Sequence, residues 1–412
     1  MKILVINGDC IEVNSSANLC HLAYIKGLLA AGHEVTLLSA DGRDYVCDPS
    51  MTIPKEVQCY TYYGVSLYEK FALLKKNAGT NKVTAGSDRK VSSLASFKRK
   101  AVKNLKKAVL NTYGIHGIYA KFVRKAMRFR SEEVFDCVLS LSTPVTSHLL
   151  AYKLISKGHV KCCHWVQLWE DPWYSDAYGF NTVPRVFKEE RRILKYAEHI
   201  CYVSPLTLAK QKKLFPEAGS KMFWAPVPAY YTESEARPGV VIPGRFGYFG
   251  AYYPSARNLA PFYEAAVKTG VEVNICGDPH SLFSANEKMH IHPRLKLDEL
   301  RPIEQKTDVL VFLCNRQGGQ IPGKIYQYAA TSKTILFILD GTDEEKKVLR
   351  DFFEPYERFI FCDNTVEDIS SAIRKILTGD LGCVKNRPLT AFEPAAIINR
   401  ILEEGMCSRN DK

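Results

Sequence analysis

Short apolar runs alternate with amphipathic helical patterns along most of this sequence. The first run, residues 3–6, leads into a polar loop at Asn7-Gly8, and apolar residues then recur at three- and four-residue spacing across residues 18–31. That spacing predicts a helix, and the run 34–39 predicts the next strand. A strand–helix–strand unit of about 40 residues is a right-handed parallel crossover. The chain therefore starts as a doubly wound sheet.

The alternation occurs twice. It stops between residues 224 and 245, where Pro and Gly cluster as in a linker between domains, and then restarts. A chain of 412 residues also exceeds what one hydrophobic core usually supports. Further strands are expected at residues 135–141, 160–168, 199–203, 246–250, 271–276, 308–313, 334–339 and 359–362. The predicted organisation is a Rossmann-like domain over 1–225, a linker over 226–244, a second such domain over 245–385, and a C-terminal helix and tail over 386–412.

Composition narrows the class of protein. With 46% hydrophobic and 24% charged residues the chain is typical of globular proteins, and no run approaches the roughly 20 apolar residues that span a bilayer. The apolar start is too short for a secretory signal. The 13 Cys contain no Cys-x-x-Cys pair, so we expect neither a disulfide framework nor a metal site in a cytoplasmic, reduced protein. No Gly-x-Gly-x-x-Gly follows the first strand, which argues against a nicotinamide-dinucleotide site.

Positive charge is concentrated in one segment. Residues 82–130 contain 14 basic residues and one acidic residue, whereas the whole chain has a net charge of +12. Basic and apolar residues there follow helical spacing, which predicts a basic helical insertion. One interpretation is docking on an anionic membrane at its inner face. The other is a solvated insertion that packs one face on the sheet. Nucleic acid is not expected, because no nucleic-acid-binding module is present.

Glycines follow several of the predicted strands in the second half. Gly250 and Gly277 end two strands, and Gly323-Lys324 opens a predicted helix after a third. Ligands of parallel sheets bind outside the carboxyl ends of the strands, and glycines let backbone N–H groups approach an anion. Lys324 and Arg257 would add positive charge for a phosphate. The alternative is a flexible loop with two solvated cations.

The order of these motifs resembles GT-B glycosyltransferases, especially those of family 4. The resemblance rests on Gly247-Tyr-Phe-Gly250, Arg257-Asn258, the run 308–311 and Ile321-Pro-Gly-Lys-Ile-Tyr-Gln-Tyr328, and on Gly32-His-Glu-Val35 and Asp171-Pro-Trp173 in the first half. It implies two Rossmann-like doubly wound domains facing across a cleft, with acceptor on the N-terminal and nucleotide sugar on the C-terminal domain. The implied reaction is sugar transfer from a nucleoside-diphosphate sugar, most simply a UDP-sugar, to a glycan or lipid-linked glycan in cell-surface polysaccharide biosynthesis. A retaining mechanism without a metal cofactor is also implied.

The resemblance assigns roles to individual residues. Lys324 and Arg257 would stabilise the departing diphosphate, Asp171 would orient the acceptor or act as base, and His148 would contact the transferred sugar. A turn or helix cap remains the alternative for Asp171, and a structural histidine the alternative for His148. The donor would lie against Gly250, Gly277, Gly323, Lys324, Gln327 and Tyr328.

One departure concerns two glutamates that the family carries eight positions apart. Gly319 and Gln327 stand at those positions here. An amide has one oxygen acceptor where a carboxylate has two, so the contact with the donor ribose is weaker or different. Two alternatives therefore stay open, a UDP-sugar 2-epimerase-like enzyme with Glu170-Asp171 as its acid/base pair, and a catalytically silent binding protein of the same fold.

Overall fold

The computed structural model describes residues 1–43, 45–65, 114–175, 182–230, 244–316 and 320–406. The chain divides into two compact units, each with its own parallel sheet. The first unit takes in residues 1–202, 210–225 and 398–412. The second takes in residues 203–209 and 226–397. Two parallel-sheet α/β domains were predicted, and this fold class is confirmed.

The first unit contains a seven-stranded sheet in the order β3-β2-β1-β4-β5-β6-β7. Every neighbouring pair is parallel. The central strands are almost wholly buried, as expected of a sheet with helices on both faces. The strands are β1 (Lys2–Asn7), β2 (Glu34–Ala40), β3 (Gln58–Tyr62), β4 (Val134–Ser142), β5 (Lys161–Trp169), β6 (His199–Tyr202) and β7 (Met222–Trp224).

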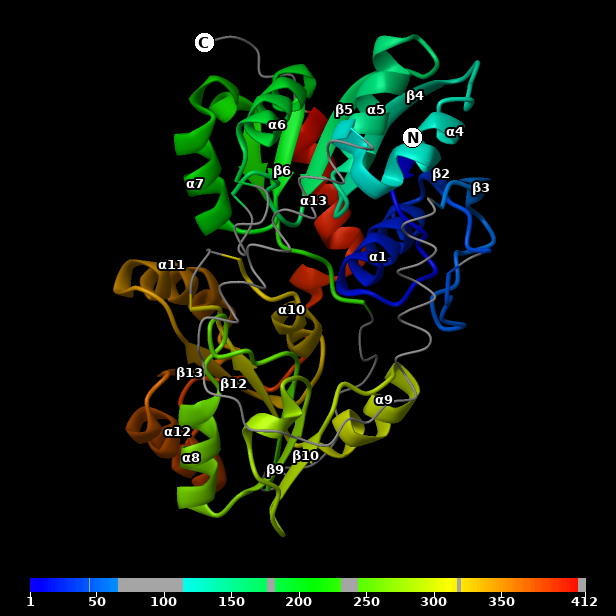
Figure 1. The fold of residues 1–412 in the computed structure, drawn as a ribbon. Coiled ribbons are helices and arrows are strands. Elements are labelled where there is room, and N and C mark those ends of the chain that lie inside the picture. The colour runs from blue at the N-terminus through cyan, green and yellow to red at the C-terminus, as the bar shows by residue number, and fades with distance from the viewer. Residues whose placement is uncertain (44, 66–113, 176–181, 231–243, 317–319, 407–412) are drawn as a thin grey trace. The chain divides into compact units, whose positions relative to one another are not determined.

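Helices of the first unit connect and cover these strands (Figure 1). Helix α5 packs on β4 and β1. The last helix ends close to β5, where a Cβ at Gly405 would lie 2.9 Å from Val166 Cγ2, so this position has room only for glycine. The helices are α1 (Ser16–Ala30), η1 (Gly114–Tyr119), α4 (Ala120–Ala126), α5 (Thr146–Ser156), α6 (Pro184–Tyr196), η2 (Pro216–Lys221), and two that are shared between the units, α7 (Pro205–Leu214) and α13 (Pro394–Met406).

The second unit contains a six-stranded parallel sheet in the order β10-β9-β8-β11-β12-β13. Numbered within the unit this is 3-2-1-4-5-6, the order of a dinucleotide-binding Rossmann sheet. The strands are β8 (Arg245–Phe249), β9 (Glu272–Cys276), β10 (Met289–His292), β11 (Val309–Leu313), β12 (Thr334–Leu339) and β13 (Ile360–Asp363).

Helices α8 and α12 lie side by side on one face of the second sheet (Figure 1). Their buried side chains, among them Phe262 and Ile373, share one apolar core with Val273 and Val311 of the strands. The helices of this unit are α8 (Ala260–Thr269), η3 (His280–Leu282), α9 (Leu297–Lys306), α10 (Lys324–Ala329), α11 (Asp343–Phe353), η4 (Glu354–Tyr356), α12 (Val366–Thr378) and η5 (Thr390–Phe392).

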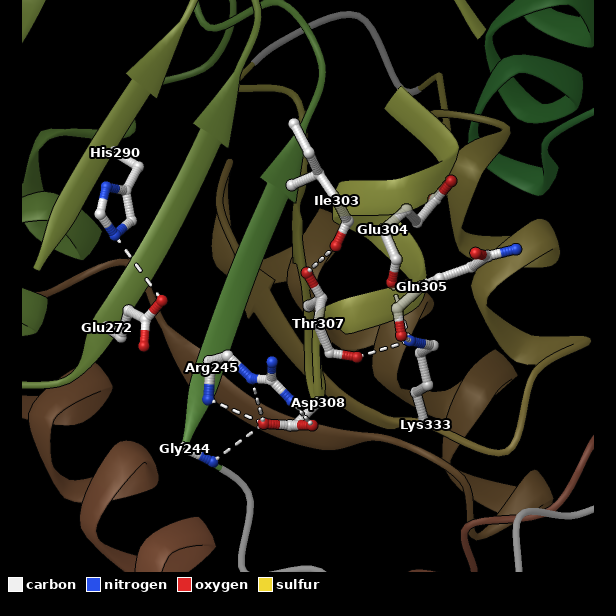
Figure 2. Close-up of polar contacts among 10 residues, drawn as sticks. All are labelled: Gly244, Arg245, Glu272, His290, Ile303, Glu304, Gln305, Thr307, Asp308 and Lys333. Atoms are coloured by element: carbon white, nitrogen blue, oxygen red, sulfur yellow. Dashed lines mark hydrogen bonds and ion pairs between the residues drawn. The ribbon is translucent and has the colours of Figure 1, made fainter. Parts of the chain in front are cut away.

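A buried lysine closes the carboxyl end of α9 (Figure 2). Lys333 Nζ donates hydrogen bonds to the backbone oxygens of Glu304, Gln305 and Thr307, at 2.8, 2.8 and 2.5 Å. The last carbonyl groups of a helix lack hydrogen-bond partners within the helix. A cation beside them is also attracted by the negative end of the helix dipole. Lys333 thus ties α9 to the start of β12.

The predicted strands are confirmed within one or two residues, but three strands and the helix α11 were missed. Strand β3 is mostly exposed and β10 has only four residues, two of them His, so neither has an apolar run. Strand β7 has three residues. Helix α11 is rich in charge, with only Leu349 and Phe353 buried.

The basic insertion and the linker are described only in part. Residues 82–113 and 231–243 lie outside the described residues, and the described part of the predicted basic insertion contains η1 and α4. Within the described part of the chain, no helix has the length and apolar character needed to cross a membrane.

Candidate functional site

The second unit has its topological switch point between β8 and β11. Connections leave these neighbouring strands in opposite directions, and ligands of open α/β sheets bind in the resulting crevice, outside the carboxyl ends of the strands. The predicted donor-binding glycines follow the strands at this end. Gly250 comes directly after β8, and Gly277 comes directly after β9.

Gly250 and Gly277 are in close backbone contact. The Gly250 N–H donates to the oxygen of Cys276 at 3.0 Å. A Cβ at Gly277 would lie 1.9 Å from the oxygen of Gly250, a distance that no side chain tolerates. Only glycine at position 277 therefore lets the loops after β8 and β9 approach this closely.

Arg257 joins the two strands of the switch point. Its Nε donates to Oδ1 of Asn315, after β11, at 2.7 Å, and its guanidinium also donates to the oxygen of Ala251, after β8, at 3.3 Å. The Asn315 amide donates in turn to the oxygen of Gln320 at 3.3 Å. A hydrogen-bonded path thus holds a half-exposed guanidinium beside Gly250.

Lys324, the first residue of α10, reaches the same strand ends. Its Nζ lies 5.6 Å from the ring centroid of Phe249 and 5.9 Å from that of Tyr328. The ammonium forms no hydrogen bond or ion pair with any described residue. Burial lowers the pKa of Lys324, and the negative charge of Glu304 opposes that shift. A cation whose charged form burial disfavours is stabilised by a bound anion.

Gln327 and Gly323 contact a different segment. Gln327 is buried, and its Oε1 accepts a hydrogen bond from the Tyr230 N–H at 2.6 Å. A Cβ at Gly323 would lie 3.4 Å from Val227 Cγ2. Both residues thus help to hold residues 227–230 against α10. The structure brings Gly250, Gly277, Arg257, Lys324 and Tyr328 together, and Oε1 of Gln327 contacts Tyr230. Gly319 lies outside the described residues.

The first unit places His148 in its core. The ring is fully buried, its Nδ1 lies 2.8 Å from Ser140 Oγ, and its centroid lies 4.3 Å from that of Trp169. Burial, and then the neighbouring His21, lower the pKa of His148 well below its usual value. This is a neutral core histidine, and the geometry is that of the structural alternative rather than of a sugar contact.

Asp171 is exposed directly after Glu170, at the carboxyl end of β5. Burial raises the pKa of Glu170 well above its usual value, and the charge of Asp171 adds to the shift. The two carboxyl groups therefore differ in character. The charged form of Glu170 is disfavoured, while Asp171 faces solvent.

Sequence reasoning missed the partner of Glu170. His21 of α1 is buried, with its Nε2 3.5 Å from Glu170 Oε1 and its Nδ1 2.9 Å from Asn7 Oδ1. The Asn7 amide nitrogen donates to the oxygen of Asp9, so Asn7 Oδ1 faces the ring and Nδ1 is the protonated nitrogen. Burial lowers the pKa of His21 to about 3. The neutral imidazole of His21 thus faces the carboxyl group of Glu170, for which burial favours the protonated form. The sequence signal that could have identified His21 is a polar residue within the otherwise apolar pattern of the helix α1.

A cavity lies at the other end of the second sheet. Its volume is about 520 Å³, and its lining includes Gly244, Gly270, Glu272, Lys288 and His290, at the amino ends of β8 and β9. His290 Nε2 lies 3.6 Å from Glu272 Oε1 there (Figure 2). The cavity contains none of the glycines and cations of the switch point, and we do not assign it to the candidate site.

Comparison with known proteins defines the fold. No family model and no curated protein matches the sequence. The chain is similar in structure to a glycosyltransferase from Rickettsia africae, with 13% identity over 100% of this chain and 99% of that one and a TM-score of 0.54. It is also similar to a sucrose-phosphate synthase from Thermosynechococcus elongatus, with 13% identity over 98% of this chain and 94% of that one and a TM-score of 0.53. A third similar structure is that of the lipopolysaccharide outer core galactosyltransferase WaaB, with 12% identity over 98% of this chain and 99% of that one and a TM-score of 0.51.

These solved structures are GT-B glycosyltransferases, and their similarity spans both units of the chain. The two parallel-sheet domains therefore form the GT-B fold. At 12–13% identity the likeness concerns the fold.

Proposed function

We propose that this protein is a glycosyltransferase that moves a sugar from a nucleoside-diphosphate sugar to a hydroxyl group of a glycan or lipid-linked glycan. One observation carries the proposal. Arg257 and Lys324 bring two cationic groups to the carboxyl ends of β8 and β9, beside Gly250 and Gly277. That combination suits a diphosphate.

Cations at this place have a chemical role as well as a binding role. When the bond between the sugar and the diphosphate breaks, negative charge develops on the departing phosphate. Lys324 and Arg257 would stabilise that charge, and the stabilisation is strongest in a site with little water. Burial lowers the pKa of Lys324, and no hydrogen bond or ion pair with a described residue holds its ammonium, so this cation is available to a ligand.

The first unit would supply the acceptor side. Asp171 is the exposed carboxylate next to the partly buried Glu170, and it would orient the acceptor hydroxyl or remove its proton. Glu170 is too deeply placed for that role. We infer that it keeps Asp171 and the carboxyl end of β5 in position instead.

The finer assignments belong to the same proposal. We infer a retaining transferase of the family 4 type that uses a UDP-sugar without a metal cofactor in cell-surface polysaccharide biosynthesis. A lipid-linked acceptor would explain a basic segment at residues 82–130, which would hold a cytoplasmic enzyme on the anionic inner face of a membrane.

The experiment is a donor panel. Purified protein is incubated with UDP-, GDP- and ADP-sugars, with and without glycan acceptors, and nucleotide release and product mass are measured. Acceptor-dependent transfer supports the proposal. Formation of a C2 epimer would replace it with an epimerase, and nucleotide binding without turnover of any donor would replace it with a silent binding protein.

A further inference from the structure

Two thiols and one carboxylate converge beside the carboxyl ends of β1 and β2. The Sγ atoms of Cys10 and Cys47 and one carboxylate oxygen of Glu12 all lie within 4.8 Å of one another. Around a tetrahedral zinc ion with Zn–S near 2.3 Å and Zn–O near 2.0 Å, ligand atoms are roughly 3.5 Å apart. Closing the three atoms onto one ion therefore requires movements of about 1 Å or less.

Hydrogen bonds between the two loops hold these ligands in place. The oxygen of Asp9 accepts from the Ala40 N–H at 3.2 Å and from Ser39 Oγ at 2.8 Å. On the far side of the cluster, the oxygen of Glu12 accepts from the Asp48 N–H at 2.9 Å. The loop after β1 is thus fastened to the chain after β2 on both sides of the cluster, which limits the cost of ordering the ligands.

Gly42 leaves space in front of all three ligands. A Cβ at this position would lie 2.9 Å from Cys47 Sγ, 3.2 Å from Glu12 Oε2 and 3.4 Å from Cys10 Sγ. Its φ is not in the left-handed region, so the backbone itself does not demand glycine. The absent side chain opens the face on which the three ligand atoms converge.

The charge of the cluster calls for a cation. Glu12 is half-buried, and its carboxylate forms no hydrogen bond or ion pair with any residue in the described ranges. The nearest basic side chain on the loop after β2, Arg43, is engaged with the carboxylate of Asp41. A carboxylate beside two soft sulfur atoms is a ligand set that favours zinc over magnesium or calcium.

We propose that Cys10, Glu12 and Cys47 form a binding site for a thiophilic divalent cation of the zinc type. The site takes three ligands from the protein and leaves the fourth position to solvent. The bound ion fastens the loop after β1 to the loop after β2, at the ligand-binding edge of the first sheet. This proposal does not depend on glycosyl transfer.

The test is calorimetric titration of reduced, metal-free, full-length protein with Zn²⁺, and titration with Co²⁺ to detect thiolate ligation by absorption. We expect one tight site in the wild type and in Cys163→Ser, a control that removes an exposed cysteine elsewhere in the same sheet. Cys47→Ser and Glu12→Gln should each weaken it about tenfold or more, at least the loss that follows removal of an outer-shell partner.

Gly42→Ala is the sharper variant, because it keeps every ligand and fills the space in front of them. Weakened Zn²⁺ binding with an unchanged melting temperature is expected. The proposal is overturned if Glu12→Gln and Gly42→Ala, checked for folding by circular dichroism, bind Zn²⁺ as tightly as the wild type. It is also overturned if the reduced wild type shows no Co²⁺–thiolate absorption, or binds no Zn²⁺ and instead yields a Cys10–Cys47 disulfide under mild oxidation.

Discussion

The backbone oxygen of Gly250 occupies the space that a side chain at Gly277 would need. The obstacle is backbone rather than a flexible side chain, so it cannot move aside without shifting the loop after β8. That loop carries the glycine and leads to the arginine of the candidate donor site.

Gly277→Ala should therefore lower both stability and nucleotide affinity. Overpacking of this kind costs about 1–3 kcal/mol, which corresponds to a fall in melting temperature of several degrees. Calorimetry and nucleotide titration measure the two effects. Gly219→Ala is the matched control, because its Cβ would meet Lys212 only at an ordinary 3.7 Å. Equal melting temperatures for the two variants would contradict the close approach.

Lys324→Ala should reduce sugar transfer about a hundredfold or more, because it removes a cation aimed at the departing diphosphate. Since burial disfavours the charged ammonium and no hydrogen bond or ion pair with a described residue holds it, the melting temperature should stay the same or rise. Steady-state kinetics and calorimetry test the pair of outcomes. Lys347→Ala, at an exposed pair with Asp351 at 2.6 Å, serves as control and should leave transfer unchanged. Full turnover in Lys324→Ala would remove this residue from the mechanism.

Gln327→Ala should destabilise the second unit by about 1 kcal/mol or more, because the Tyr230 N–H loses the acceptor that now lies at 2.6 Å. Gln327→Glu keeps an acceptor there and should retain stability. Because a carboxylate has a further oxygen for a ribose hydroxyl, it should also bind the donor nucleotide more tightly. Denaturant unfolding and nucleotide titration separate the effects, and equal stability of the Ala variant would show that this hydrogen bond contributes nothing.

Glu170→Gln should change how stability depends on pH. The pKa of Glu170 is raised in the folded protein, so its contribution to stability is complete below the unfolded value of about 4.5 and is lost as pH rises toward the folded value. The glutamine variant lacks this titration. As the pH rises above about 4.5, the difference in free energy of unfolding between the glutamine variant and the wild type should shift in favour of the variant. Parallel pH profiles for the two proteins would show that the carboxyl group is not perturbed.

The segment 82–130 offers a test of membrane binding. Replacing Lys103, Lys106 and Lys107 with Glu should weaken sedimentation with anionic vesicles, since each cation near such a surface contributes about 1 kcal/mol. The same charge change at Lys210, Lys212 and Lys213 of α7 is the control, because these three lysines are exposed. Equal loss in both variants would point to net charge rather than to this segment.

The order of strands and helices could be predicted from the sequence because the periods of strands and helices are local properties. Residues 3–6, 18–31 and 34–39 carry their spacing within a few residues, and β1, α1 and β2 follow it. The positions of Gly250 and Gly277 after apolar runs likewise identified the carboxyl ends of two strands. Elements without a local apolar pattern, such as β10 and α11, escaped this reasoning.

Contacts between strand ends were decided only by the tertiary structure. His21 meets Glu170 across 149 positions because β1, β4 and β5 are neighbours in the sheet, while their order along the chain separates them widely. Cys10 and Cys47 fit no cysteine motif, yet the parallel pairing of β1 with β2 brings the loops after them together. The sequence alone determined which elements form. The order of the strands in the sheet decided which side chains meet, and burial decided their charge states. Strand order and burial both depend on residues far apart in the chain.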